Sequence, residues 1–300
     1  MKKTLQICVV ILVGIFVLLT VLDYKGEYAS QKELWKINKY FVEIAQDPNA
    51  APSASFDKAA AQFNSYLKKF PNSSSTPIAH ILLGRAHLLK KDYNKAREIY
   101  EEIVVKYKDR PEIAVQAVAE IGRSYADQGD IDGVMRVYDR IVADFPLTDL
   151  GLRTPLLKAK YYFDHNELQK ASEAFSSAIV YYKQLIVKHP DSDIEYSALR
   201  LIASCYLAQE RWEEAINVFS EMLLDFADPR YLNAQRAQTA LNTINTISIV
   251  KLENYDLPIG IYQKFITKYP EHPITPTLEG MIKSFEVLKQ KNVQAVESGS

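Results

Sequence analysis

Three cationic side chains recur at nearly the same interval along the chain. Arg85, Arg123 and Lys160 are separated by 38 and 37 residues, and each directly follows a small residue. Because guanidinium and ammonium groups bind carboxylates through charge-assisted hydrogen bonds, a row of them suits an acidic peptide or a C-terminal carboxylate. An alternative use is local. Asp127 and Asp164 stand four residues after Arg123 and Lys160, and such pairs stabilise a helix by only about 0.3–0.5 kcal/mol.

The other reactive residue types form no catalytic or metal-binding pattern. His80 and His87 lie seven residues apart, whereas a zinc-binding helix uses four-residue spacing and further ligands. Cys205 falls beside an aromatic position inside an apolar segment, which indicates an inert packed thiol. No glycine-rich phosphate-binding loop is present in the sequence. We therefore expect no enzyme activity, no catalytic residue, no cofactor and no metal.

The composition narrows the class of protein. The chain has 300 residues and a formal charge of -1, and 48% of its residues are hydrophobic. That apolar content is sufficient for a large core, so extensive disorder is excluded. The near-neutral charge lacks the basic excess of a dedicated nucleic-acid binder, and we expect no nucleic-acid partner.

The first residues predict a membrane helix. Lys2 and Lys3 precede an uncharged segment from Thr4 to Leu22, which as a helix is about 28 Å long and just spans a bilayer core. The alternatives are a cleaved signal peptide, for which Ala29 and Ser30 offer only a poor site, and a buried helix. Because the lysines precede the segment, we expect an uncleaved anchor in a bacterial inner membrane, with the bulk of the chain on the periplasmic side.

Five segments share one pattern of small and aromatic residues. A small residue is followed three positions later by an aromatic in most copies, twelve positions later by an alanine in most copies, and sixteen positions later by a Tyr or Phe. The small position is occupied by Gly84, Gly122, Ala159, Ala203 and Thr246, and the last aromatic by Tyr100, Tyr138, Phe175, Phe219 and Tyr262. This periodicity predicts helix–turn–helix units that must stack to bury their apolar faces.

The interval between successive units is longer near the C-terminal end of the chain. The alanine position, counted from Ala59 in an earlier half-copy, advances by 37, 38, 37, 44 and 43 residues. The last two intervals predict about two extra helical turns or longer loops. Prolines punctuate the units, and Thr76, Thr154 and Thr275 precede Pro77, Pro155 and Pro276 as candidate helix N-caps.

These columns resemble the tetratricopeptide repeat family over about residues 54–291. The family interval is 34 residues, so the longer interval here and the Tyr/Phe-Pro endings are similar to bacterial cell-envelope members, namely BamD-like and CpoB/YbgF-like proteins, with a YfgM-like layout. The resemblance implies an all-α, right-handed solenoid of about six helix pairs with a C-terminal capping helix. It also places the cationic column on a concave groove, together with groove residues Arg153 and Arg200.

Apolar residues of the same groove offer a second mode of binding. The resemblance places Ile81, Leu88 and Phe163 there, where they would hold a helix from a partner or from another copy of the chain. The alternative is that these side chains pack against an adjacent part of the same superhelix.

The predicted organisation is an anchor at 1–22, a helix and loop at 23–53, a solenoid at 54–291 and a polar tail at 292–300. Its predicted function is a membrane-anchored scaffold or assembly factor for a cell-envelope complex, with protein partners and a possible homo-oligomer. The alternative function is a non-catalytic structural subunit that docks or polymerises a membrane-associated enzyme complex.

Overall fold

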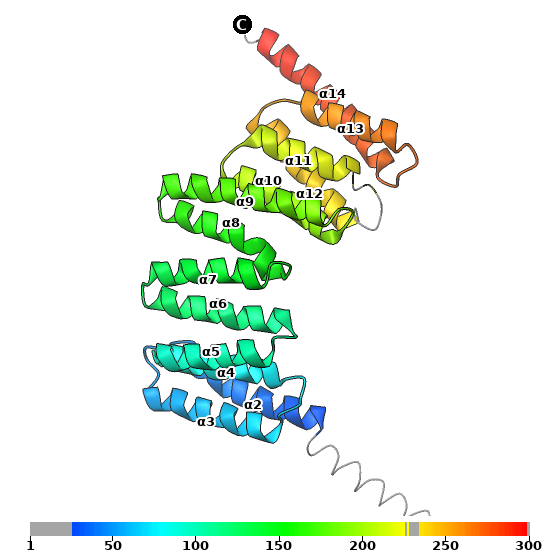
Figure 1. Cartoon of the computed structure of the whole chain (residues 1–300). Coiled ribbons are helices and arrows are strands. Elements are labelled where there is room, and N and C mark those ends of the chain that lie inside the picture. The colour runs from blue at the N-terminus through cyan, green and yellow to red at the C-terminus, as the bar shows by residue number, and fades with distance from the viewer. Residues whose placement is uncertain (1–25, 226, 228–233, 299–300) are drawn as a thin grey trace, which may run out of the picture. The chain divides into compact units, whose positions relative to one another are not determined.

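The computed structural model describes residues 26–225, 227 and 234–298. These residues form thirteen α-helices and one π-helix, and no strand occurs among them. The chain divides into two compact units, residues 1–151 and 152–300, and consecutive helices form antiparallel hairpins within each unit (Figure 1). The all-α repeat fold predicted from the columns is therefore confirmed.

The first unit contains three hairpins around one apolar core. Its small and aromatic columns are buried: Ala96 and Tyr100 have no exposed surface, and neither has Phe63 of the half-copy. Leu34, Ile37 and Phe41 join the same core, so the helix predicted between anchor and solenoid packs as the first helix of this stack. The helices are α2 (Glu27–Ala45), α3 (Ser53–Lys69), α4 (Thr76–Leu89), α5 (Tyr93–Lys106), α6 (Pro111–Asp127) and α7 (Ile131–Asp144).

The second unit continues the repeat pattern with a long helix and a π-helix. Helix α9 has 21 residues, whereas α5, α7 and α11 have 14 each. The 44-residue interval predicted either two extra helical turns or a longer loop, and the seven extra residues of α9 are the helical turns. The helices are α8 (Asp149–Asp164), α9 (Leu168–Lys188), α10 (Asp193–Ala208), α11 (Trp212–Asp225), α12 (Ala234–Asn245), η1 (Thr246–Lys251), α13 (Asp256–Lys268) and α14 (Thr275–Ser298).

The prediction of a membrane anchor is corrected. Among the helices of residues 26–225 and 234–298, none has both the length and the apolar character needed to cross a bilayer. The segment on which the prediction rested, residues 1–22, lies outside the described residues. The fold class of the described residues is the all-α repeat stack, and the predicted membrane-anchored periplasmic location is withdrawn.

The threonines before prolines are not the predicted N-caps. Thr76 and Thr275 are buried, and their hydroxyls donate to the carbonyls of Phe70 and Tyr269 at 2.6 and 2.9 Å. These carbonyls follow the preceding helices α3 and α13, where the last backbone acceptors lack intrahelical donors. Each threonine lies at the start of one helix, and its hydroxyl bonds to the carbonyl that ends the preceding helix. This contact depends on the turn that joins the two helices.

Pro155 lies in the interior of α8 rather than in its first turn. The hydroxyl of buried Tyr182 donates to the Leu152 carbonyl at 2.9 Å and accepts from the Leu156 amide at 3.1 Å. These are the two groups that would bond to each other in an uninterrupted helix. Tyr182 on α9 therefore bridges a break in the backbone ladder of α8, which explains how a proline is accommodated there.

A left-handed residue recurs at the turn inside the hairpins. Seven positions after the small residue, φ lies between 51° and 73° in all five copies, at Lys91, Gly129, Asn166, Glu210 and Glu253. In the first two copies the following amide donates to the carbonyl five residues back at 2.9 Å, which closes the end of the helix. Only one of the five positions carries glycine, the residue that adopts this conformation without steric cost.

We predict that Tyr182→Phe destabilises the second unit. The substitution leaves the Leu152 carbonyl and the Leu156 amide without their shared partner, so the free energy of unfolding falls by about 1–3 kcal/mol. The matched control is Tyr181→Phe, because the Tyr181 hydroxyl is buried without a hydrogen-bond partner among the described residues. Urea unfolding of the full chains measures both. An equal effect of the two variants would contradict the bridging role.

We predict opposite effects for two substitutions at the left-handed turn of the first unit. Lys91→Gly relieves backbone strain and raises the free energy of unfolding by about 0.5–1 kcal/mol. Gly129→Ala introduces the same strain and lowers it by about 1 kcal/mol, although an added Cβ there would meet no atom within 4 Å. Chemical denaturation measures both changes, and a loss of stability in Lys91→Gly would refute the explanation.

Candidate partner-binding surface

Arg85 and Glu120 form an ion pair between the first helices of neighbouring hairpins. Arg85 extends from α4 and Glu120 from α6, and their side chains are 37% and 13% exposed. The sequence offered Arg85 no partner within its own helix, and its partner comes 35 residues later in the chain. Since stacking brings α4 against α6, the cationic position is tied to a carboxylate that the sequence did not pair with it.

The ion pair leaves several polar atoms of the same cluster unsatisfied. The Nε atom of Arg85, the second carboxylate oxygen of Glu120 and the hydroxyl of Tyr100 are buried without hydrogen-bond partners among the described residues. Burial, assisted by the negative charge of Glu120, raises the pKa of Tyr100. Its ring lies against Gly84, where a Cβ would overlap it. Buried polar atoms are normally paired, so the polar groups of this cluster are incompletely satisfied among the described residues.

Arg123 supplies an uncompensated charge beside this cluster. It follows Glu120 by one helical turn on α6 and is exposed, and its charge acts on the Tyr100 hydroxyl. The predicted intrahelical pair with Asp127 is not formed, and Arg123 has no ion-pair partner within the described part of the chain. Its guanidinium is therefore available to an external carboxylate.

The predicted apolar groove residues of the first unit differ in exposure. Leu88 is only 2% exposed and belongs to the core, so it is not accessible to a partner. Ile81 is half-buried and packs against the same core. The family resemblance placed Leu88 on the groove, whereas the alternative of packing within the stack holds for this residue.

The second unit holds the remaining predicted residues. Lys160 and Arg200 are exposed on α8 and α10, and Lys160 has no ion pair with Asp164 or with another described residue. Phe163 is 46% exposed, with its ring edge toward Phe175 at a centroid distance of 6.5 Å. Arg153 is exposed but interacts with another residue. The predicted row of cationic residues is thus divided between the two units. Arg85 and Arg123 belong to the first unit, and Lys160 belongs to the second.

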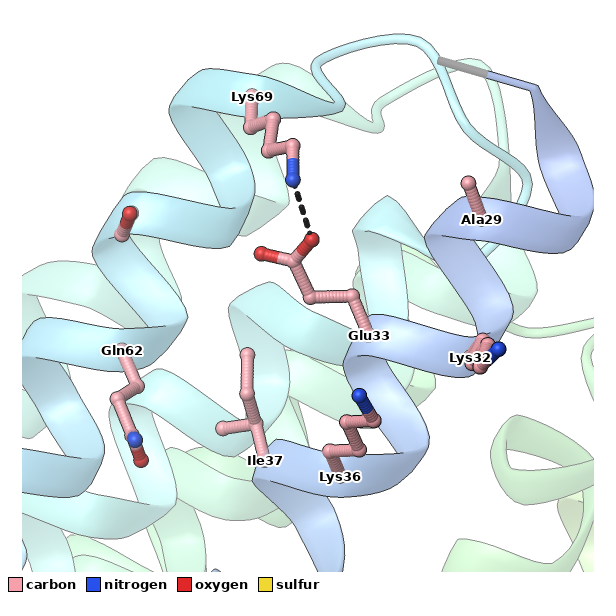
Figure 2. Close-up of a pocket in the computed structure, with 8 residues that line it drawn as sticks. Ala29, Lys32, Glu33, Lys36, Ile37, Gln62 and Lys69 are labelled. Atoms are coloured by element: carbon pink, nitrogen blue, oxygen red, sulfur yellow. Dashed lines mark hydrogen bonds and ion pairs between the residues drawn. The ribbon is translucent and has the colours of Figure 1, made fainter. Parts of the chain in front are cut away.

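A lysine-lined hollow of the first unit was not predicted from the sequence. It lies between α2 and α3 and has a volume of about 480 Å³. Figure 2 shows Lys32, Lys36 and Lys69 around it, with Glu33 paired to Lys69 at 2.6 Å. Three lysines and one carboxylate leave this hollow cationic, and the side-chain oxygen of Gln62 in its wall is buried without a partner. The four-residue spacing of Lys32 and Lys36 was the available sequence signal.

Two of the histidines and the cysteine lie in environments that are typical of structural residues and not of a catalytic or metal site. The Nδ1 atom of His80 lies 3.4 Å from the hydroxyl of Tyr107, and that of His87 lies 3.4 Å from Asp92. Cys205 has no exposed surface, and burial raises the pKa of its thiol to about 12, so the thiolate is not populated near neutral pH. The described residues contain no group of three or more His, Cys, Asp or Glu placed to hold a metal ion.

Two segments of the chain match family models of the tetratricopeptide repeat, residues 53–111 and residues 155–238. The chain therefore contains tetratricopeptide repeats, as the columns of small and aromatic residues indicated. The narrower similarity to BamD-like, CpoB/YbgF-like and YfgM-like proteins finds no support in these matches.

Solved structures of repeat proteins are also similar to the chain. One is the TPR2AB domain of yeast Sti1 in complex with pHSP90, which is 15% identical and aligns over 87% of this chain and 100% of that one with a TM-score of 0.33. Another contains the nearly identical tetratricopeptide-like repeats of a putative kinesin light chain from Podospora anserina, 14% identical over 76% of this chain and 98% of that one with a TM-score of 0.36. No curated protein matches the chain.

We predict that His80 makes the first unit less stable in mild acid. Burial, with a smaller contribution from Lys106, lowers the pKa of His80 from 6.5 to about 4. The unfolded chain therefore takes up the proton first, and stability that is present above pH 6.5 is lost as the pH falls toward 4. After allowance for solvent screening, we expect His80 to account for about 1–2 kcal/mol of this loss.

Urea midpoints measured between pH 7.5 and 4 provide the test. His80→Gln is expected to flatten the pH dependence relative to the wild-type chain, because glutamine has no proton to take up. The exposed residue His165 gives the control, and His165→Gln should keep the wild-type slope. Parallel curves for wild type and His80→Gln would contradict the assignment.

Proposed function

We propose that the protein is a non-catalytic interaction scaffold or assembly factor. Stacked helical repeats present extended surfaces to protein segments, because each hairpin adds one further row of side chains to the same face. Tetratricopeptide repeats occupy a large part of this chain, and the cysteine of the described residues, Cys205, is completely buried.

The first unit is the proposed binding region for an acidic segment of a partner protein. The observation that carries this proposal is the exposed, unpaired guanidinium of Arg123 beside the polar cluster of Arg85, Glu120 and Tyr100. A carboxylate of the partner would be bound by Arg123 through charge-assisted hydrogen bonds.

The lysine-lined hollow supports the same charge preference. Lys36 has no ion-pair partner among the described residues, and Lys32 lies over the Tyr28 ring at 5.8 Å. Both therefore keep an uncompensated positive charge that attracts acidic segments to the first unit. Such surface cations increase the rate of association more than they increase affinity, so the main loss on mutation is expected at Arg123.

We predict that Arg123→Glu weakens partner binding. Co-purification of the tagged full chain from its source organism, followed by mass spectrometry, first identifies the stoichiometric partner. Loss of a charge-assisted hydrogen bond, together with new repulsion, is then expected to raise the Kd of that partner roughly ten-fold or more. Combining it with Arg85→Glu should weaken binding further.

The control is Lys108→Glu, which makes the same charge change at an exposed residue in the turn after α5. It should bind the partner within about two-fold of the wild type, as expected for an exposed charge outside the binding site. Thermal unfolding of each variant confirms that the hairpins remain folded. Unchanged binding by Arg123→Glu would refute the proposed site.

A further inference from the structure

A second cleft lies in the second unit, on helices that do not contribute to the acidic-segment site. Helices α9 and α11 both pack against α10, and the space between them has a volume of about 530 Å³. Its apolar lining comes from all three helices, namely Ile186, Val187, Leu199, Ile202 and Val218. A volume of this size holds several apolar side chains of a bound segment.

The two extra turns of α9 build one wall of this cleft. A helix of 14 residues beginning at Leu168, as in the other hairpins, would end at residue 181. The additional turns, residues 182–188, carry Lys183, Ile186 and Val187 into the lining. The insertion visible as a 44-residue interval therefore contributes three of the residues that line this cleft.

The α9 wall of the cleft exposes an aliphatic side chain to solvent. Val187 is 81% exposed, although the cleft floor beside it, formed by Leu199 and Ile202, is almost completely buried. An exposed aliphatic side chain at the edge of an apolar floor loses hydration favourably when a partner covers it.

The charges around the cleft determine what kind of partner fits. Glu221 has no ion pair among the described residues, whereas nearby Glu214 is paired with Arg211 and Asp225 with Lys268. Partial burial, followed by the negative charges of Asp225 and Glu195, raises the pKa of Glu221, and the positive charge of Lys183 on the α9 wall opposes this shift by a smaller amount. The α11 side of the cleft therefore presents an exposed carboxylate without an ion pair, near which the other carboxylates outweigh Lys183, and a positively charged side chain complements it.

We propose that this cleft binds a helical segment of a partner protein that carries an aliphatic residue and, one turn away, a lysine or arginine. The aliphatic side chain covers Ile186 and Val187, and the cation pairs with Glu221. A helix suits the space because the groove between two helices accepts the apolar stripe of a third. The proposal extends the scaffold role to a second site with the opposite charge preference, so one chain would join an acidic segment and a basic amphipathic segment.

The test uses a phage-displayed library of 16-residue helical peptides selected on the full chain. Full chain carrying Val187→Asp serves for counter-selection. We expect enriched sequences to combine an aliphatic residue with a Lys or Arg three or four positions away. The synthesised peptides should bind wild type roughly ten-fold more tightly than Val187→Asp or Glu221→Lys.

Two matched variants serve as controls. Val105→Asp changes a valine that is 73% exposed on α5, and Glu213→Lys reverses an exposed charge on α11 outside the cleft lining. Both should bind the peptides as the wild type does. Arg123→Glu should also leave peptide binding unchanged, which separates a failure of this cleft from a failure of the proposed acidic-segment site. Enriched peptides without a basic residue, or equal binding to Val187→Asp, would overturn the proposal.

Discussion

The close approach of the two helices in each hairpin is the constraint on which the rest of the structure depends. In the second hairpin the ring of Tyr100 lies directly on Gly84 and is completely buried. Neither helix buries its apolar face alone, and the next hairpin covers what the first leaves open. The same packing brings α4 beside α6, so it also creates the cluster in which Arg85, Glu120 and Tyr100 meet. The proposed partner-binding surface is thus a consequence of how the core closes.

Departures from the regular repeat mark the places where the chain acquires distinct surfaces. A regular stack needs only hairpins of constant length, yet α9 is seven residues longer than its counterparts in three other hairpins. The added turns position the Tyr182 hydroxyl at the break in α8 and also form a wall of the cleft over α10. One insertion therefore both stabilises a helix that contains Pro155 and supplies an exposed apolar edge.

Charge in this protein is arranged locally. The whole chain has a formal charge of -1, yet the first unit presents Arg123 and a lysine-lined hollow, and the second presents Glu221 without an ion pair among the described residues. The two proposed sites have opposite charge preferences, which would allow one scaffold to distinguish its partners, because like charges disfavour the wrong segment. Overall composition does not reveal such an arrangement.

The sequence by itself determined the repeat, its helical hairpins and the presence of seven extra residues in one interval, because small and aromatic residues at fixed intervals report packing within one hairpin. Only the structure showed that these residues extend α9 and do not lengthen a loop. It did not determine which charges pair, since the Glu120 partner of Arg85 lies 35 residues away on a neighbouring helix. Burial of Leu88 and the bridging hydroxyl of Tyr182 likewise depend on contacts between helices. Only the tertiary structure decided these features, because a periodic pattern specifies the face of a helix but not what covers that face.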